Sequence, residues 1–119
     1  MTTAEIADRL CELCAAGRYR DAIGELYAPD TTQLENGERM PGGRDALVEA
    51  CKGWEESRVV HSTDIIGTCV GPDSFTVEMR HDVTPHATKK RHQWSEAGVY
   101  RVRNGKVVEV RFYYKPPDA

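Results

Sequence analysis

Two residues that can exchange protons, His81 and Glu96, each lie at every second position together with mostly apolar residues. Residues 75–83 alternate strictly between an apolar and a polar set. The apolar set is Phe75, Val77, Met79, His81 and Val83. Glu96 shares its alternation with Trp94, Gly98, Tyr100 and Val102. Because successive side chains of a strand point to opposite faces, we expect both titratable groups to face a covered, apolar interior.

A carboxyl group in such an interior is suited to proton transfer. Apolar surroundings disfavour its charged form and raise its pKa, so Glu96 could exchange a proton near neutral pH with His81 as its partner. The pair predicts isomerisation, aldol-type cyclisation or dehydration of a small carbonyl compound. Two alternatives remain open: a buried pair that only hydrogen-bonds, and a binding role without catalysis. One bulge between residues 92 and 98 would also turn Glu96 outward.

Aromatic and flexible apolar side chains are expected to line the same interior as a ligand site. Their positions are Tyr27, Trp54, Met79, Trp94, Tyr100, Phe112 and Tyr114. An apolar concavity with a few polar groups is the usual form of a small-molecule site. The tyrosines could donate hydrogen bonds to a ligand carbonyl, or each could satisfy only its own hydroxyl as a core residue. Trp54 could likewise contact a ligand at the pocket mouth or be only a core residue.

The four cysteines do not form a zinc-site pattern. Cys11 and Cys14 are a C-x-x-C pair inside a helical pattern, whereas Cys51 and Cys69 are too far apart in sequence to supply the second close pair of a structural zinc site. The histidines outside the proposed pair lack the spacing of metal ligands. We therefore expect reduced thiols, no metal and no cofactor.

The composition excludes several function classes. The chain has 119 residues, 39% hydrophobic and 29% charged, with a net charge of −3. Disordered chains are less hydrophobic and more highly charged, and no apolar run is long enough to cross a bilayer. Non-specific nucleic-acid binding needs a basic footprint that is missing here. The first ten residues lack the apolar segment of a signal peptide. We expect a cytoplasmic protein with one domain over residues 1–119 and no nucleic-acid or membrane partner.

Helical spacing comes first in the chain and strand alternation later. Thr2 and Glu5 form a capping-box pattern that predicts a helix over 3–16. A second helix, containing Tyr27, should end at Pro29, since proline disfavours helical geometry in the residue before it. The remaining predictions are a strand over 31–35, a helix over 44–57, and strands over 59–70, 75–83, 92–103 and 107–114. Asn104-Gly105 predicts a tight hairpin.

The order α-α-β-α-β-β-β-β predicts an α+β fold. Its later strands are longer than the usual length of about five or six residues, and long strands curl readily. We expect a curved antiparallel sheet packed against three N-terminal helices, shaped as a cone with a cavity. The inward face of the last strand is expected to carry Val108, Val110, Phe112 and Tyr114. The outer face is charged and is interrupted by Val99, Val107 and Tyr113.

Three stretches resemble one known superfamily. Leu26-Tyr27-Ala28-Pro29-Asp30 is similar to the end of its second helix, Gly43-Arg44-Asp45-Ala46 to the start of its third, and residues 99–108 to its final hairpin. In order and spacing the chain resembles the nuclear transport factor 2-like (ketosteroid isomerase-like) superfamily. Residues 60–85 and the Phe112-Tyr113-Tyr114 ending are most similar to its SnoaL-like polyketide cyclase branch. The resemblance implies a cystatin-like cone, a hydrophobic pocket for a small molecule and, often, a homodimer.

The same resemblance limits the chemistry. By spacing, His81, Phe112 and Met79 stand where the limonene-epoxide hydrolases of this superfamily have two aspartates and an arginine, so we do not expect epoxide hydrolysis. We expect a SnoaL-like small-molecule-binding protein acting as an isomerase, cyclase or dehydratase. The alternatives are a non-catalytic ligand-binding module and a dimeric interaction module. Related folds dimerise through the outer sheet face, and the arginines and Tyr113 there suit an interface.

Overall fold

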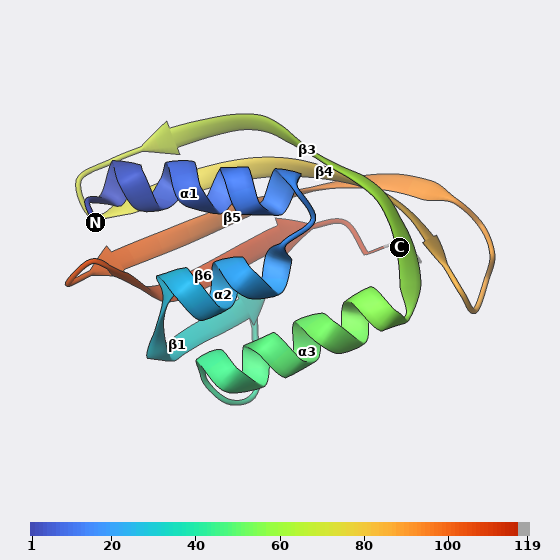
Figure 1. Cartoon of the computed structure of the whole chain (residues 1–119), viewed down its shortest axis with the longest axis horizontal. Coiled ribbons are helices and arrows are strands. Elements are labelled where there is room, and N and C mark those ends of the chain that lie inside the picture. Colours follow the sequence, from blue (N-terminus) through green and yellow to red (C-terminus); the bar gives the residue numbers. More distant parts are fainter. Residues whose placement is uncertain (117–119) are drawn as a thin grey trace.

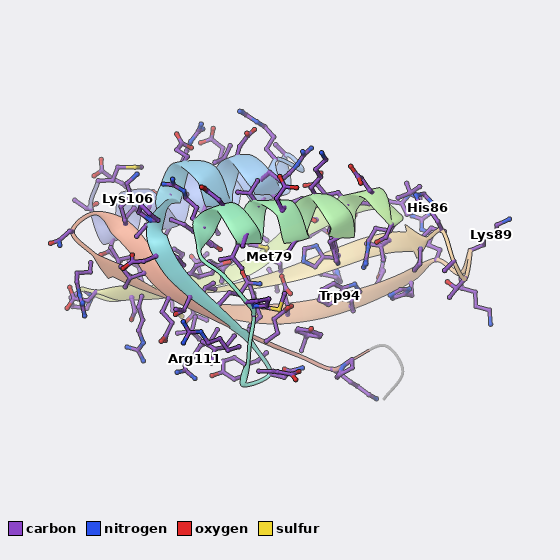
Figure 2. The ribbon with its side chains drawn as sticks, turned by 90° about the horizontal axis from the view of Figure 1, so that it is seen from below. Met79, His86, Lys89, Trp94, Lys106 and Arg111 are labelled. Carbon is purple, nitrogen blue, oxygen red and sulfur yellow. The ribbon has the colours of Figure 1, made fainter. Side chains whose placement is uncertain are left out.

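Three helices cover one face of a curved, six-stranded sheet in the computed structural model, which describes residues 1–116 (Figures 1 and 2). The elements are α1 (Thr3–Ala15), α2 (Tyr19–Leu26), β1 (Tyr27–Glu35), β2 (Glu38–Arg39), α3 (Arg44–Glu56), β3 (Arg58–Val70), β4 (Ser74–Pro85), β5 (His92–Arg103) and β6 (Lys106–Tyr114). The strand order is β2-β1-β6-β5-β4-β3. The predicted α+β class is confirmed.

Helix α1 begins at the capping box that the sequence predicts. The Thr2 hydroxyl accepts the backbone N–H of Glu5, and the Thr2 backbone N–H donates to the Glu5 carboxylate at 2.8 Å. The helix buries a stripe of residues three or four positions apart: Ile6, Leu10, Leu13 and Cys14. Gly17 then takes a positive φ of 76°, a conformation open to glycine that turns the chain toward α2.

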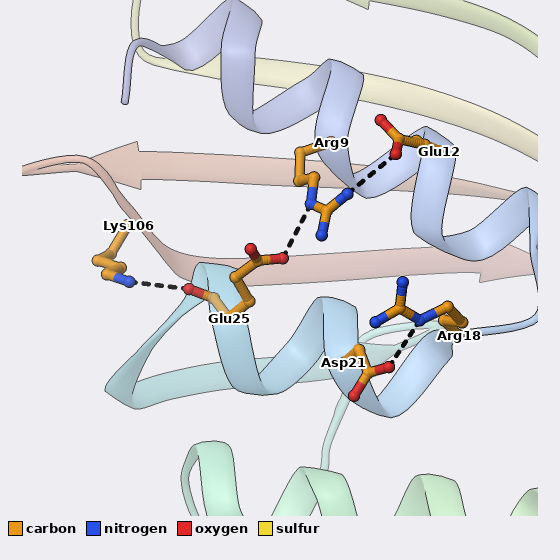
Figure 3. Close-up of polar contacts among 6 residues, drawn as sticks. All are labelled: Arg9, Glu12, Arg18, Asp21, Glu25 and Lys106. Atoms are coloured by element: carbon orange, nitrogen blue, oxygen red, sulfur yellow. Dashed lines mark hydrogen bonds and ion pairs between the residues drawn. The ribbon is translucent and has the colours of Figure 1, made fainter.

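Charged side chains connect α1, α2 and the final hairpin on the surface (Figure 3). Arg9 of α1 donates to Glu12 at 2.9 Å and to Glu25 of α2 at 3.0 Å. The Lys106 ammonium donates to the backbone carbonyl of Glu25 at 2.8 Å. Exposed ion pairs contribute at most about 1 kcal/mol each. The helices are therefore held on the sheet mainly by their buried apolar stripes.

The strands from β3 to β6 form a continuous antiparallel meander. Asn104 and Gly105, with φ of 52° and 73°, make the tight turn between β5 and β6, as type I′ hairpins require. Strand β1 joins the sheet by pairing in parallel with β6. The pairing runs from Tyr27 beside Val107 to Glu35 beside Phe112, and α3 packs against β1.

The second helix is shorter than the sequence predicts. It ends at Leu26, and Tyr27 has extended geometry (φ −88°, ψ 144°) and opens β1. Pro29 lies within β1, where the pairing with β6 is interrupted between Tyr27 and Thr32. A proline cannot donate to a ladder, so it is tolerated at such an irregularity. Strand pairing with β6, which lies far away in sequence, therefore overrides the helical spacing of Tyr27.

The inward face of β6 also differs from the prediction at its start. Arg101 pairs with Glu109, but Val102 pairs with Val107, which leaves Val108 as an extra residue in a bulge. Val107 is therefore fully buried, although simple alternation predicts it on the outer face, and Val108 is only half-buried. Beyond the bulge, Val110 is buried as predicted.

The long strands bend the sheet around the helices. β3, β4 and β5 span 13, 12 and 12 residues. The pairing of β3 with β4 shifts register between Val60 and Ser62 and again between Ile65 and Gly67, and such bulges increase bending. In Figure 1, β3 curves over α1. None of the helices in residues 1–116 is long and apolar enough to span a membrane.

Candidate functional site

A cavity of about 210 Å³ lies between the helices and the sheet. It is lined by His81 and Glu96 and by six of the seven predicted ligand contacts: Tyr27, Trp54, Met79, Trp94, Tyr100 and Phe112. Ligand pockets commonly measure roughly 300–1,000 Å³. The lining is apolar and aromatic with a few polar groups, and the volume lies below this range.

Tyr114, the seventh predicted contact, lies outside this lining. Its hydroxyl donates to the carboxylate of Glu35 at 3.2 Å, and its ring packs against Trp94 with the ring centroids 5.4 Å apart. Tyr114 therefore supports two lining residues and does not itself face the cavity. Alternation groups Tyr114 with Phe112, but only Phe112 is among the residues that line the cavity.

His81 and Glu96 form a hydrogen-bonded pair at the cavity wall. The distance from His81 Nε2 to Glu96 Oε1 is 3.1 Å. His81 is 4% exposed, and the Glu96 side chain is 13% exposed. Strands β4 and β5 pair without a register shift from Val83 to Ser74. The bulge that would turn Glu96 outward is therefore absent from β5 over residues 92–101.

A hydroxyl relay continues the pair on the other side of the imidazole. His81 Nδ1 lies 2.8 Å from the hydroxyl of Thr63 on β3, and that hydroxyl bonds to the phenol of Tyr19 on α2. An ionised carboxylate can only accept, so with Glu96 ionised the proton of a neutral His81 resides on Nε2. Nδ1 then accepts from Thr63, which accepts from Tyr19.

Thr63 was not among the residues predicted from the sequence. It lies directly opposite His81 in the β3–β4 pairing and is 6% exposed. Its inward orientation follows from the register shift between Val60 and Ser62, which resets the alternation of β3. A run of β-forming residues does not reveal such a shift.

Aromatic rings fix the position of the imidazole from three directions. The ring centroids of Tyr19, Trp54 and Trp94 lie 6.3, 5.8 and 4.7 Å from that of His81. Arg58 in turn covers Trp54, with its guanidinium carbon 4.4 Å from the ring centroid. His81 is therefore held by both hydrogen bonds and ring packing.

A second carboxyl group, Glu35 on β1, also lines the cavity. Burial raises the pKa of Glu35, and the negative charge of Glu96 raises it further, while the hydrogen bond from Tyr114 opposes both effects. The sequence predicts a strand here, but the facing of its residues depends on pairing with β6. That pairing is not local, so alternation within residues 31–35 could not identify Glu35.

The remaining titratable groups of the cavity stay protonated at neutral pH. Burial raises the pKa of Tyr27 and Tyr100 well above the ordinary phenol value. Burial also raises the pKa of the Cys14 and Cys51 thiols to about 12. All four cysteines are free, and the C-x-x-C pair lies within α1. Among residues 1–116, no group of three or more histidine, cysteine or acidic side chains is arranged to hold a metal ion.

This arrangement combines one base–partner pair with neutral donors in an apolar space. Glu96 can accept a proton while His81 donates to its carboxylate, and the tyrosine phenols can donate to a ligand oxygen. Such groups can carry out general acid–base chemistry without a cofactor.

Residues 1–114 match the family model of the SnoaL-like domain. The chain belongs to the SnoaL-like family. A search of curated proteins gave no match. A solved structure from Mesorhizobium loti, named provisionally as a SnoaL-like polyketide cyclase, is 38% identical to this SnoaL-like chain. The match has a TM-score of 0.84 and covers 96% of this chain and all of the other.

Two more distant structures share the fold of this SnoaL-like protein. A protein of ketosteroid isomerase-like fold from Catenulispora acidiphila, solved with trimethylamine, is 21% identical, with a TM-score of 0.77 and coverage of 96% and 88% of the two chains. A provisionally named isomerase from Bacillus subtilis is 16% identical, with a TM-score of 0.77 and coverage of 96% and 86%. At these identities the likeness shows the fold alone.

Proposed function

We propose that this SnoaL-like protein catalyses proton transfer at carbon in a small carbonyl compound, leading to isomerisation, cyclisation or dehydration. The observation that carries the proposal is the His81–Glu96 pair, which is nearly buried and opens onto the cavity. Catalytic acids and bases are typically placed in such apolar clefts, because burial tunes their proton affinity.

In the proposed reaction Glu96 is the base. Its carboxylate removes a proton from the carbon next to the carbonyl, the C–H electron pair forms a C=C bond, and the carbonyl π electrons move to oxygen. The neutral phenol of Tyr27 or Tyr100 donates a hydrogen bond to that oxygen. Where a C=C bond is conjugated with the enolate, protonated Glu96 returns its proton to the far carbon of that bond, which gives an isomer. In a cyclisation the enolate carbon instead attacks a second carbonyl, whose oxygen takes the proton from Glu96. In a dehydration the enolate expels a β-hydroxyl group, which leaves as water with that proton.

His81 acts on Glu96 in this scheme. Its Nε2–H orients the carboxylate and stabilises its charge before the proton is taken up. The hydroxyls of Thr63 and Tyr19 hold the imidazole in the tautomer that donates at Nε2. Thr63 is a positioning residue, since it contacts the base only through His81.

A non-catalytic ligand-binding role is the second candidate. It is favoured by one observation: both ring nitrogens of His81 already have hydrogen-bond partners in the protein, Thr63 and Glu96. A pair satisfied in this way can be structural, with the aromatic cavity only retaining its ligand.

Deuterium exchange distinguishes the two roles. Small ketones and 1,3-dicarbonyl compounds incubated with protein in D2O would lose their α-proton NMR signals if Glu96 abstracts protons. We expect Glu96→Gln to slow this exchange by about 10²-fold or more. Glu78→Gln, on the exposed outer face of β4, is the matched control and should exchange at the original rate. Equal exchange by wild type and Glu96→Gln would reject the catalytic role.

A further inference from the structure

The cavity has, within residues 1–116, two carboxyl groups but no lysine or arginine in its walls. Glu35 and Glu96 both line it, and none of its lining residues in the described part of the chain is lysine or arginine. Glu96 accepts from His81 and Glu35 accepts from Tyr114. These donors, an imidazole and a phenol, hold the carboxylates in place without a permanent positive charge. A ligand therefore meets two carboxyl groups and, from the described residues, no permanent cation.

The nearby arginines are already engaged outside the cavity. Arg58 stacks on Trp54, and Arg20 pairs with Glu55 at 3.4 Å. An anionic ligand would have to bury its charge beside two carboxyl groups without a lysine or arginine partner among the described lining residues, which is costly in an apolar space. The lining consequently disfavours carboxylates and phosphates as ligands.

Six aromatic residues contribute to the remaining wall, together with aliphatic side chains. Tyr19, Trp54 and Trp94 surround His81, and Tyr100 and Phe112 meet edge to face with centroids 6.0 Å apart. The faces of such rings attract organic cations electrostatically. A bare divalent metal instead needs a set of oxygen ligands, which the rings do not offer. An alkylated ammonium ion matches both the charge and the apolar surface.

We propose that the cavity binds a small alkylated ammonium ion in preference to a neutral or anionic molecule of the same shape. The proposal that this ion is the substrate rests on the proton transfer proposed above. An ammonium group close to the substrate carbonyl would stabilise the enolate that Glu96 generates. The cavity itself offers that enolate only neutral hydroxyl donors, so the substrate would carry its own positive charge.

Three molecules of nearly identical shape test the charge preference: choline, 3,3-dimethylbutan-1-ol and 3,3-dimethylbutanoate. Titration calorimetry on the wild-type protein at neutral pH should show choline binding about tenfold more tightly than the alcohol, and the carboxylate binding most weakly. Glu35→Gln and Glu96→Gln should each reduce the preference for choline. Glu78→Gln removes the same charge from the opposite face of the sheet and should leave the preference unchanged.

The comparison of ligands on the wild-type protein does not depend on any variant folding. Binding of the alcohol or the carboxylate as tight as that of choline would overturn the inference, as would no binding of any of the three. Choline preference without deuterium exchange would reject only the catalytic role. If the exchange of neutral ketones depends on Glu96 but choline is not preferred, only the proposal of a cationic ligand is rejected.

Discussion

Hydrogen bonds determine which nitrogen of the neutral His81 imidazole carries the proton when Glu96 is ionised. His81 has one ring nitrogen directed at a carboxylate and the other at a hydroxyl. Since the carboxylate of Glu96 can only accept, the hydroxyl of Thr63 becomes the donor on the opposite side. The carboxylate of Glu96 thus selects the imidazole tautomer, and one buried threonine on a neighbouring strand donates to the nitrogen that is left unprotonated.

Thr63→Val should remove the donor to Nδ1 without changing the volume of the side chain. We expect the ¹⁵N NMR signals of His81 to show a protonated Nε2 and an unprotonated Nδ1 in both proteins, with the Nδ1 signal of the variant shifted because this nitrogen has lost its hydrogen bond. Leaving buried Nδ1 without a donor should lower the free energy of unfolding by about 1–3 kcal/mol. Thr63→Ser keeps the hydroxyl and should restore the wild-type spectrum. An unchanged spectrum in Thr63→Val would contradict the assignment.

Glu35 should make stability depend on pH in a defined direction. Because its pKa is raised in the folded protein, the folded state keeps its proton to a higher pH than the unfolded chain does. Stability therefore falls as pH rises from the unfolded pKa through the raised folded value. Relative to Glu35→Gln, the wild-type protein should be more stable near pH 4 than near pH 7 in urea unfolding. The opposite slope would show that Glu35 is stabilised as an anion.

At the level of elements, local patterns predict more than long-range pairing does. The alternation of β4 correctly predicts that His81 and Met79 are covered, because successive side chains of a regularly paired strand point to opposite faces of the sheet. The position of Thr63 depends on a register shift in β3, and that of Glu35 on the parallel pairing of β1 with β6. Both features arise between segments far apart in sequence, so periodicity within either segment contains no signal for them.

Gly98 on β5 leaves space for the aromatic wall of the cavity. A Cβ atom at this position would lie 2.8 Å from the Tyr100 ring and 2.9 Å from the Phe112 ring. Gly98→Ala should therefore shift both rings, lower the free energy of unfolding by about 1–3 kcal/mol and weaken choline binding.

A second glycine provides the control for this substitution. Gly53 lies in α3 with no atom within 4 Å of a Cβ position. Gly53→Ala should instead stabilise the protein by about 0.5–1 kcal/mol, because glycine loses more conformational freedom within a helix. Equal behaviour of the two variants in thermal melts would show that the rings at Gly98 can move freely.

For the whole molecule, the outer face of the sheet is the expected surface for self-association. Glu109 pairs there with Arg101 at 3.2 Å and Arg111 at 2.9 Å, and Tyr113 is 48% exposed. The bulge at Val108 removes Val107 from this face, so its predicted apolar contribution is smaller than alternation suggests. Arginine and tyrosine remain, and both are enriched in interfaces.

We expect a homodimer that buries this face. Light scattering after size-exclusion chromatography should give a mass about twice the 13.3 kDa of one chain at micromolar concentration. Tyr113→Glu should shift the protein toward the monomer, because it would bury an unpaired charge in the interface. Lys52→Ala, on the exposed side of α3, should have no effect. A monomeric wild-type protein would leave the outer face as a solvated surface.

The extra residue at position 108 shifts the alternation of β6, so that odd-numbered residues face inward before it and even-numbered residues face inward after it. Val107 and Val110 are three positions apart, and both lie in the interior only because Val108 is an extra residue between them. If all residues were kept and the bulge were lost, plain alternation from Val107 would place Glu109, Arg111 and Tyr113 on the inside. The bulge therefore keeps a carboxylate and a guanidinium group out of the apolar interior, and a deletion of Val108 should preserve this facing because Val107 and Glu109 would then follow regular alternation.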